Sequence, residues 1–292
     1  MIAFVLGANI LWVNTYGSYC PGGYCYDLTS RYTSLRDTLI AHGHAIQSTT
    51  SHVDAMDLSP YGVIIVCLGS NWNGSFTASE AHALAEFVRQ GKGLLVMSEN
   101  SACPNSNLQA ILDTFSFTAG GVDPGDVTAT NFTTSPPWAN MFVGIGALKF
   151  DDPGAVTGPN WLIEYGGNYF GAAECFGSGS QGVAMIIGDI NPWDNNTLNQ
   201  ADNKAFLLNV VGFLQDADNQ CASLGLSEEP APAKVSLGRL RLESGARAEV
   251  YSVEGRLFGV FSGPGEFELP KGISILKVQK GGKTWSLKAL SR

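Results

Sequence analysis

The sequence predicts an α/β domain with a doubly wound, mostly parallel sheet, followed by a small antiparallel β-domain. Two observations support this. Short apolar runs without polar alternation, typical of strands covered on both faces, are separated by segments with helical apolar spacing. The charge then changes sign. Residues 234–292 hold 11 basic and 5 acidic residues, about +6, whereas residues 1–233 hold 6 basic and 21 acidic residues, about −15.

The apolar runs predict buried strands at residues 2–6, 62–68, 93–97 and 182–187. No basic segment precedes the run at 2–6, so we interpret it as a first strand and not as a signal peptide. No apolar run approaches the 18 or so residues of a membrane-spanning helix, and the sequence therefore predicts no transmembrane segment.

Helices are predicted between these strands, at residues 31–42, from 77 onward, at 105–115 and at 203–214. The first ends at Gly43, and the second begins with Thr77-Ala-Ser-Glu80, the pattern of a capping box. Strand and helix alternate along the chain, which favours a sheet of the flavodoxin-like type.

Two segments interrupt this alternation. Residues 117–175 are rich in Gly, Pro, Thr and aromatic residues and predict a β-rich insertion whose strands cannot be placed. Residues 217–235 contain Ser227-Glu-Glu-Pro-Ala-Pro-Ala233 and predict an extended, polar linker. The expected domains are therefore residues 1–216 and 236–292.

Residues 236–292 predict short antiparallel strands that form a small β-sandwich. The runs Val250-Tyr-Ser-Val-Glu-Gly-Arg256, Leu269-Pro-Lys-Gly-Ile-Ser-Ile-Leu-Lys-Val278 and Thr284-Trp-Ser-Leu-Lys-Ala-Leu290 are separated by turns at Gly263-Pro-Gly265 and Gly281-Gly282. This pattern resembles the C-terminal sorting domain of type IX secretion cargo. The resemblance implies export to the cell surface and contact with the secretion machinery. A generic β-sandwich is the alternative, and the sequence does not show whether the domain is cleaved off.

Six cysteines stand at positions 20, 25, 67, 103, 175 and 221. Cys20-Pro-Gly-Gly-Tyr-Cys25 lies in a loop where a turn can bring both sulfurs together, and it lacks the second pair that a zinc site needs nearby. We predict a local disulfide there, which agrees with an oxidising, extracellular location. The pairing of the other four stays open.

Residues 1–216 resemble the class I glutamine-amidotransferase-like superfamily. The similarity lies in Tyr61-Gly-Val-Ile-Ile-Val66, in the segment from Thr77 to Val96, and in Gly188-Asp-Ile-Asn-Pro-Trp-Asp194 with the helix after it. Catalytic members carry a Cys on the turn after the strand that corresponds to 94–97, and a His partner late in the domain. This chain has Ser98-Glu99-Asn100 at the turn and no His between 189 and 196, so amidotransferase activity is not expected.

Other catalytic motifs are also missing. There is no Gly-x-Ser-x-Gly serine elbow. The four histidines, His42, His44, His52 and His82, all lie in the first third of the chain. A metal site of histidines and carboxylates can be imagined from them, but we interpret them as helix-end and surface residues.

Polar and aromatic residues follow three of the predicted strands, at the carboxyl-end crevice where ligands bind in such sheets. Aromatic rings beside amides and carboxylates can stack on a sugar and hydrogen-bond it, which suggests a glycan site. Two carboxylates there, Glu99 and Asp189, could perform acid/base hydrolysis at a suitable separation. The predicted rim consists of Asn71, Trp72, Glu99, Asn100, Asp189, Asn191 and Trp193.

The loop after residue 188 offers oxygen ligands for Ca²⁺ in Asp189, Asp194 and Asp202. Asp and Asn residues are equally common in turns that bind no metal, so this loop has two interpretations. No other cofactor is expected. Nucleic acid is excluded because the acidic domain repels phosphate. The opposite charges of the two domains suggest a homo-oligomer or polymer.

The sequence thus predicts an exported, non-catalytic protein that acts by binding or self-assembly. The alternative is a secreted carbohydrate-active hydrolase that uses Glu99 and Asp189.

Overall fold

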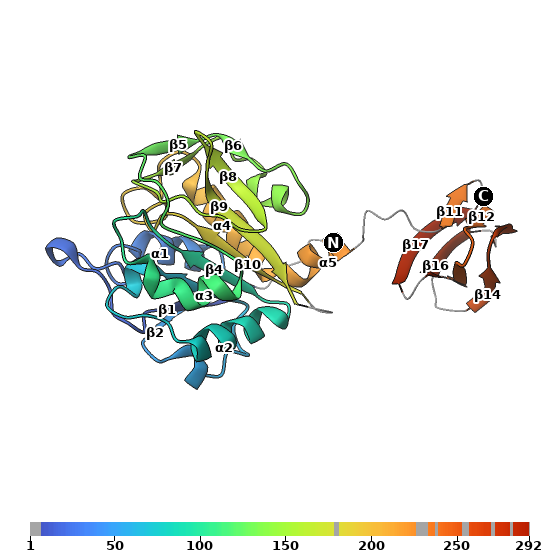
Figure 1. Ribbon diagram of the computed structural model, residues 1–292, viewed down its shortest axis with the longest axis horizontal. Helices are drawn as coiled ribbons and strands as arrows, with labels where there is room; N and C mark the ends of the chain where they lie inside the picture. Colours follow the sequence, from blue (N-terminus) through green and yellow to red (C-terminus); the bar gives the residue numbers. More distant parts are fainter. Residues whose placement is uncertain are drawn as a thin grey trace. The chain divides into compact units, whose positions relative to one another are not determined.

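The computed structural model describes residues 7–177, 181–225, 233–236, 239–252, 257–269, 272–280 and 283–291 (Figure 1). The chain divides into two compact units, Met1–Leu224 and Gly225–Arg292. Each unit buries a hydrophobic core of its own. Within the described residues, no helix combines the length and the apolar character needed to cross a lipid bilayer.

Five neighbouring strands of the first unit's sheet are parallel, in the order β2 (Ala45–Thr49), β1 (Asn9–Val13), β3, β4, β10. Three of them are the predicted apolar runs: β3 (Val63–Cys67), β4 (Gly93–Met97) and β10 (Gly182–Ile187), in which every residue is buried. Burial on both faces explains why these strands lack the polar alternation of a half-exposed sheet.

The beginning of the described sheet contains two strands that were not predicted. The strand expected at residues 2–6 lies outside the described residues, and the first described strand is β1 (Asn9–Val13). Its neighbour β2 (Ala45–Thr49) is an edge strand with mostly exposed side chains. No apolar run marks β2, because none of its side chains is fully buried.

Helices occupy the segments with predicted helical spacing: α1 (Thr33–Ala41), α2 (Ala78–Arg89), α3 (Gln109–Thr114) and α4 (Asn203–Gln215), with a 3₁₀ turn, η4 (Asn105–Leu108), before α3. α2 begins with the predicted capping box. Thr77 Oγ1 accepts the N–H of Glu80 at 3.2 Å, and the Glu80 side chain accepts the N–H of Thr77 at 2.8 Å. These bonds satisfy donors that a helix start leaves open.

α2 and α4 cover opposite faces of the sheet. A Cβ on Gly93 of β4 would meet Leu214 of α4 at 2.5 Å, and one on Gly182 of β10 would meet the Val88 carbonyl oxygen of α2 at 2.2 Å. Gly93 pairs in register with Val183, the neighbour of Gly182, and successive strand residues point to opposite faces. Helices therefore cover both sides of the sheet, as a doubly wound fold requires.

The predicted β-rich insertion extends the sheet. β9 (Asn168–Phe176) pairs antiparallel with β10, and β8 (Asn160–Tyr165) and β6 (Asn131–Phe132) follow in that order. A separate antiparallel pair joins β5 (Val127–Ala129) to β7 (Leu148–Phe150). Figure 1 shows these strands, coloured green to yellow, gathered on one side of the unit.

The end of the first unit corrects the predicted linker. Residues 217–225, expected to be extended, form the helix α5 (Ala217–Gly225). Cys221 of this helix is buried and forms a disulfide with Cys175 of β9. The predicted disulfide between Cys20 and Cys25 is also formed. A covalent bond therefore attaches α5 to the sheet, which composition alone did not indicate.

Within its described residues, the second unit contains two antiparallel sheets. One has the order β11 (Ala233–Ser236), β12 (Arg239–Leu242), β15 (Gly265–Glu268), and the other the order β14 (Leu257–Ser262), β13 (Arg247–Ser252), β16 (Gly272–Lys280), β17 (Lys283–Ser291). Leu240 and Leu242 of the first sheet share a buried cluster with Ala248, Val250 and Val278 of the second. The antiparallel strands agree with the prediction, and packing as a sandwich stays a prediction.

The predicted turns of the second unit have different outcomes. The Gly263-Pro-Gly265 turn lies where the chain passes from β14 in one sheet to β15 in the other, so it does not close a hairpin. The Gly281-Gly282 turn lies outside the described residues, between two strands that do pair with each other.

Candidate functional site

A small pocket of about 140 Å³ opens where β3, β4 and β10 end at their carboxyl ends. Four predicted rim residues line it: Trp72, Glu99, Asn100 and Asn191. Its other lining residues are Tyr19, Tyr26, Cys103, Asp151, Asp152 and Ile190. Four residues predicted to lie together therefore do so, because parallel strands bring their carboxyl ends to one edge of the sheet.

One wall of the pocket is aromatic. The rings of Tyr19 and Trp72 stack with centroids 4.3 Å apart and an interplanar angle of 18°, and Tyr26 stacks on Tyr19 at 6.0 Å and 14°. Tyr19 is 39% exposed and Trp72 is partly buried, so this wall borders solvent. Rings stacked in parallel hold one another in place and form a rigid, mostly apolar wall.

The Cys20–Cys25 disulfide holds the base of this wall. Tyr19 and Tyr26 directly flank the two cysteines, and the N–H of Tyr26 donates to the carbonyl of Tyr19 at 3.0 Å. The N–H of Tyr19 in turn donates to the carbonyl of Gly69, after β3, at 2.8 Å. The disulfide therefore ties together the two residues that flank it, which supply two of the pocket's three large rings.

Glu99 forms the acidic part of the pocket. It follows β4 and is only 4% exposed. Asn105 fixes its backbone, since its amide donates to the carbonyl of Glu99 at 2.8 Å and its oxygen accepts the N–H of Glu99 at 2.9 Å. Burial raises the pKa of Glu99 to about 8, and the charges of Asp151 and Asp152 add to the rise. At neutral pH Glu99 is therefore a neutral carboxyl that can donate a hydrogen bond.

Asp189 lies behind Glu99 and does not line the pocket. It is fully buried, and its two oxygens accept the N–H groups of Asn191 at 2.5 Å and Asp151 at 2.8 Å. Burial raises the pKa of Asp189, and the nearby Glu99 raises it further. The predicted pair is thus close enough to interact electrostatically, but within the described residues only Glu99 is among those that line the pocket.

Two predicted rim residues belong to the core instead. Trp193 is fully buried, and its Nε1–H donates to the carbonyl of Asn203 at 3.1 Å. Asn71 is also fully buried, and its side chain accepts the N–H of Thr15 at 3.0 Å and donates to the carbonyl of Val13 at 2.8 Å. Both side chains satisfy backbone groups of neighbouring loops and are not available to a ligand.

The predicted calcium ligands are not brought together. Asp194 Oδ1 accepts the N–H groups of Asn196 and Thr197, at 2.8 and 3.0 Å. Asp202 Oδ2 accepts those of Gly146 and Ala147, at 2.8 and 3.0 Å. Among the described residues, the groupings with metal-compatible spacing do not contain Asp189, Asp194 or Asp202. Asp194 therefore serves as a turn acceptor within its own loop, whereas Asp202 accepts from the distant segment that precedes β7.

Sequence reasoning missed the tyrosines of the disulfide loop and the acidic pair Asp151 and Asp152. The signal for the acidic pair was the Asp151-Asp152-Pro153 run, but its position inside an insertion without predicted strands hid its proximity to Glu99. Cys103 also lines the pocket, and burial raises the pKa of its thiol to about 12. A thiol at that pKa is protonated at neutral pH and is a poor nucleophile.

No protein-family model and no curated protein matches this chain. Among solved structures, the chain is similar to the N-terminal domain of mmIFT52, with 15% identity and a TM-score of 0.59 over 72% of this chain and 99% of that one. Structure neighbours also include a ThuA-like protein from Parabacteroides merdae (11% identity, TM-score 0.47, 72% and 90% of the two chains) and a GMP synthase-like protein from Thermoplasma acidophilum (10%, 0.42, 74% and 95%).

The last two neighbours have class I glutamine-amidotransferase-like folds, the superfamily that residues 1–216 resemble in sequence. Their TM-scores lie below 0.5, so they carry no argument about the first unit, whose fold is assigned from its own strand order. At such low identities a shared fold does not imply a shared activity. The function must therefore be inferred from the geometry of the pocket.

Proposed function

We propose that this chain is an exported protein of the cell surface or extracellular space whose first unit binds a glycan in the aromatic pocket without transforming it. The observation that carries this proposal is the stacked wall of Tyr19 and Trp72 beside the neutral carboxyl of Glu99. A sugar ring presents an apolar face of C–H groups and an edge of hydroxyl groups. The pocket offers an aromatic wall for the apolar face and polar side chains for the hydroxyl groups.

The size and polarity of the pocket narrow the ligand further. At about 140 Å³ it is smaller than the roughly 300–1,000 Å³ of pockets for drug-sized molecules, so it suits a single terminal ring. Glu99 donates from its protonated carboxyl, and Asp152 offers an exposed carboxylate acceptor. The amides of Asn100 and Asn191 line the pocket but already donate to the backbone carbonyls of Asp152 and Asp151. A neutral donor beside the carboxylate of Asp152 favours a hydroxyl-rich, uncharged ligand over an anionic one.

The absence of catalysis is supported by the turn after β4. The position of the amidotransferase nucleophile carries Ser98 and Glu99, and the Ser98 hydroxyl donates to the carbonyl of Ile187 at 3.1 Å inside the core. Export is supported by the resemblance of residues 236–292 to a sorting domain and by the two disulfides, which persist in oxidising compartments. In this proposal the second unit contacts the secretion machinery or other copies of the chain.

A glycan array followed by titration calorimetry on the full chain tests the proposal. Trp72→Ala should bind the array's best ligand about tenfold more weakly, because an aromatic contact contributes up to about 1.4 kcal/mol. Trp161→Ala is the matched control, since Trp161 is 37% exposed and stacks on Tyr169 outside the pocket. A parent chain that binds no glycan, or a Trp72→Ala variant that binds as well as the control, would refute the proposal.

The disulfide provides a second test of the same pocket. Replacing Cys20 and Cys25 together by Ser should weaken glycan binding, because the loop that holds Tyr19 and Tyr26 loses its closure. The rest of the fold should survive, since only 5 positions separate the two cysteines. Unchanged affinity in this double variant would show that the backbone hydrogen bonds alone position the wall.

A second function, hydrolysis of a glycosidic bond, is favoured by one observation. The raised pKa of Glu99, about 8, keeps the proton that a general acid must donate at neutral pH. Asp189 does not line the pocket, so Asp151 or Asp152 would have to be the second carboxylate. Release of reducing sugar by the parent and not by Glu99→Gln, with binding retained in both, would establish the enzyme. Binding without turnover in the parent would exclude it.

A further inference from the structure

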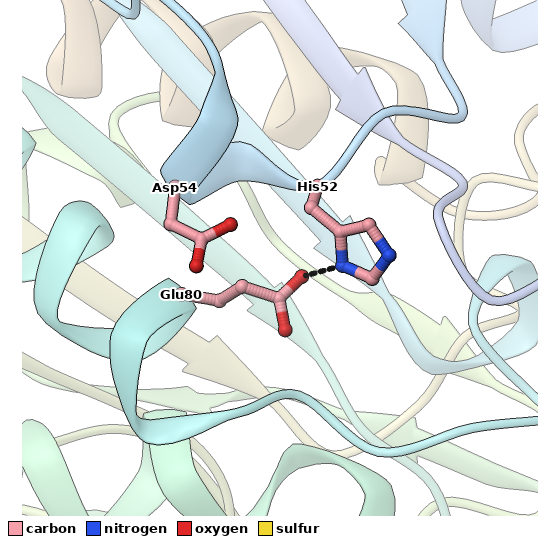
Figure 2. Close-up of side chains that lie close together, drawn as sticks. All are labelled: His52, Asp54 and Glu80. Atoms are coloured by element: carbon pink, nitrogen blue, oxygen red, sulfur yellow. Dashed lines mark hydrogen bonds and ion pairs between the residues drawn. The ribbon is translucent and has the colours of Figure 1, made fainter.

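A second group of functional side chains lies outside the pocket. His52, Asp54 and Glu80 each point a ligand-type atom into one space, and these three atoms all lie within 4.8 Å of one another (Figure 2). Asp54 lies in the 3₁₀ turn η2 (Val53–Ala55), and His52 is the residue before that turn. Glu80 belongs to the first turn of α2. None of the three lines the pocket.

Glu80 is fixed in place by its second oxygen. Its side chain is fully buried, and Oε2 accepts the hydroxyl of Tyr16 at 2.6 Å, the N–H of Thr77 at 2.8 Å and the hydroxyl of Thr77 at 3.0 Å. These bonds turn Oε1 toward His52, whose Nδ1 lies 3.0 Å away. Hydrogen bonds of this kind, made by residues behind a ligand, are what orient the ligands of metal sites.

We propose that His52, Asp54 and Glu80 bind a divalent transition-metal ion of the zinc class, with water completing its coordination. Zinc binds nitrogen and carboxylate oxygen at about 2.0–2.2 Å, so neighbouring ligand atoms of a tetrahedral site are about 3.3–3.6 Å apart. The 3.0 Å from Nδ1 to Oε1 reaches that range with a small rotation of the exposed His52 side chain. An imidazole ligand selects transition metals over Ca²⁺ and Mg²⁺. The two carboxylates of Asp54 and Glu80 neutralise a divalent charge.

Three protein ligands leave an open coordination position. The side chain of His52 is 56% exposed and Asp54 is exposed, so the ion can be reached by solvent. Three protein ligands with an open water position are typical of reactive zinc sites, whereas structural sites are closed by four. The site would therefore hold a metal-bound water at the surface, separate from the glycan pocket.

The same geometry would arise from a simple ion pair between His52 and Glu80, so the experiment must separate the two. The full chain, without a polyhistidine tag and after removal of metals by a chelator, is titrated with zinc chloride in a calorimeter. His52→Ala and Asp54→Asn remove one ligand each. Glu80 is left intact, because it also caps α2 and its loss would perturb the fold.

His82→Ala is the matched control. His82 is also exposed and also has a carboxylate nearby, with Nε2 4.0 Å from Glu86, but it has no third ligand of this kind in the groupings formed by the described residues. The parent and His82→Ala should each bind one equivalent of zinc, and both His52→Ala and Asp54→Asn should bind at least about tenfold more weakly, since even residues behind a metal ligand cost that much.

Thermal unfolding provides a second measurement. Zinc that binds only the native chain should raise the Tm of the parent and of His82→Ala, and should leave that of His52→Ala unchanged. Equal zinc affinity in the parent and in His52→Ala would overturn the proposal, and so would a parent chain that binds no zinc at micromolar concentrations. Either result would leave His52 and Glu80 as an ion pair that orders the start of α2.

Discussion

Replacing Glu99 with Gln tests the neutral carboxyl of the pocket through its effect on folding. Burial raises the pKa of Glu99 from the usual 4.5 to about 8. Between these values the folded chain keeps a proton that the unfolded chain has released, so the unfolding free energy falls as the pH rises and the loss is complete above about pH 8. One pH unit in this window corresponds to about 1.36 kcal/mol, and the range from pH 5 to pH 7 to about 2.7 kcal/mol.

Gln has nearly the same size, carries no titrating proton, and keeps an oxygen that can accept the N–H of Asn100, which Glu99 Oε1 now accepts at 2.9 Å. The unfolding free energy of Glu99→Gln, minus that of the parent, should therefore increase by about 2.7 kcal/mol between pH 5 and pH 7. The raised pKa of Asp189 should not disturb this difference, because Glu99 is neutral in the parent over that range and its replacement changes no charge near Asp189.

Guanidinium unfolding of the full chain at a series of pH values measures this difference, followed by tryptophan fluorescence. Five of the six tryptophans precede residue 225, so the signal reports mainly on the first unit. Glu86→Gln, which removes an exposed carboxylate of α2, is the control for the loss of one acidic group. A difference that stays constant from pH 5 to pH 7 would mean that Glu99 is ionised in the native chain, and it would remove the neutral donor from the proposed glycan site.

Three further predictions concern stability. Replacing Cys175 and Cys221 together by Ala should lower the unfolding free energy by about 4 kcal/mol, because the disulfide closes a loop of 46 residues, and an unchanged denaturant midpoint would mean that packing alone holds α5. Trp193→Ala should lower the unfolding free energy by about 3–5 kcal/mol, because the ring is fully buried. Trp161→Ala, at a site 37% exposed, should lower it by less than about 1 kcal/mol. Equal losses of unfolding free energy in denaturant titrations would contradict the burial of Trp193. Thr77→Ala should cost about 1 kcal/mol by removing the cap of α2, and Thr77→Ser should restore most of the Tm if the hydroxyl is responsible.

The parts of the fold that could be predicted are those whose local pattern and burial agree. β3, β4 and β10 are buried along their whole length, so each appears in the sequence as an unbroken apolar run. The start of α2 is encoded by the side chains of Thr77 and Glu80, which satisfy each other's backbone donors without help from distant residues. β2 escaped prediction because an edge strand buries too little to need an apolar pattern.

The pocket was predicted only as far as topology determines it. Trp72, Glu99, Asn100 and Asn191 follow consecutive central strands, and a parallel sheet brings those positions to one edge. Trp193 follows one of the same strands, yet its ring turns into the core, where Phe206 of α4 packs 5.7 Å from it. Which way a loop side chain turns depends on the volume left by distant residues, and no local pattern records that volume.

The disulfide between Cys175 and Cys221 has a mechanical consequence for a chain held by its second unit. Tension arriving along the backbone at Gly225 would reach Cys221 within α5 and cross a covalent bond to Cys175 in β9. It would then spread through the hydrogen bonds of β9 with β8 and β10. Residues 181–220, which include Asn191 of the pocket, would lie off this covalent path, so a tethered copy could be pulled without first unravelling α4. Reduction of this one bond would make α5 and then α4 the first elements to peel away.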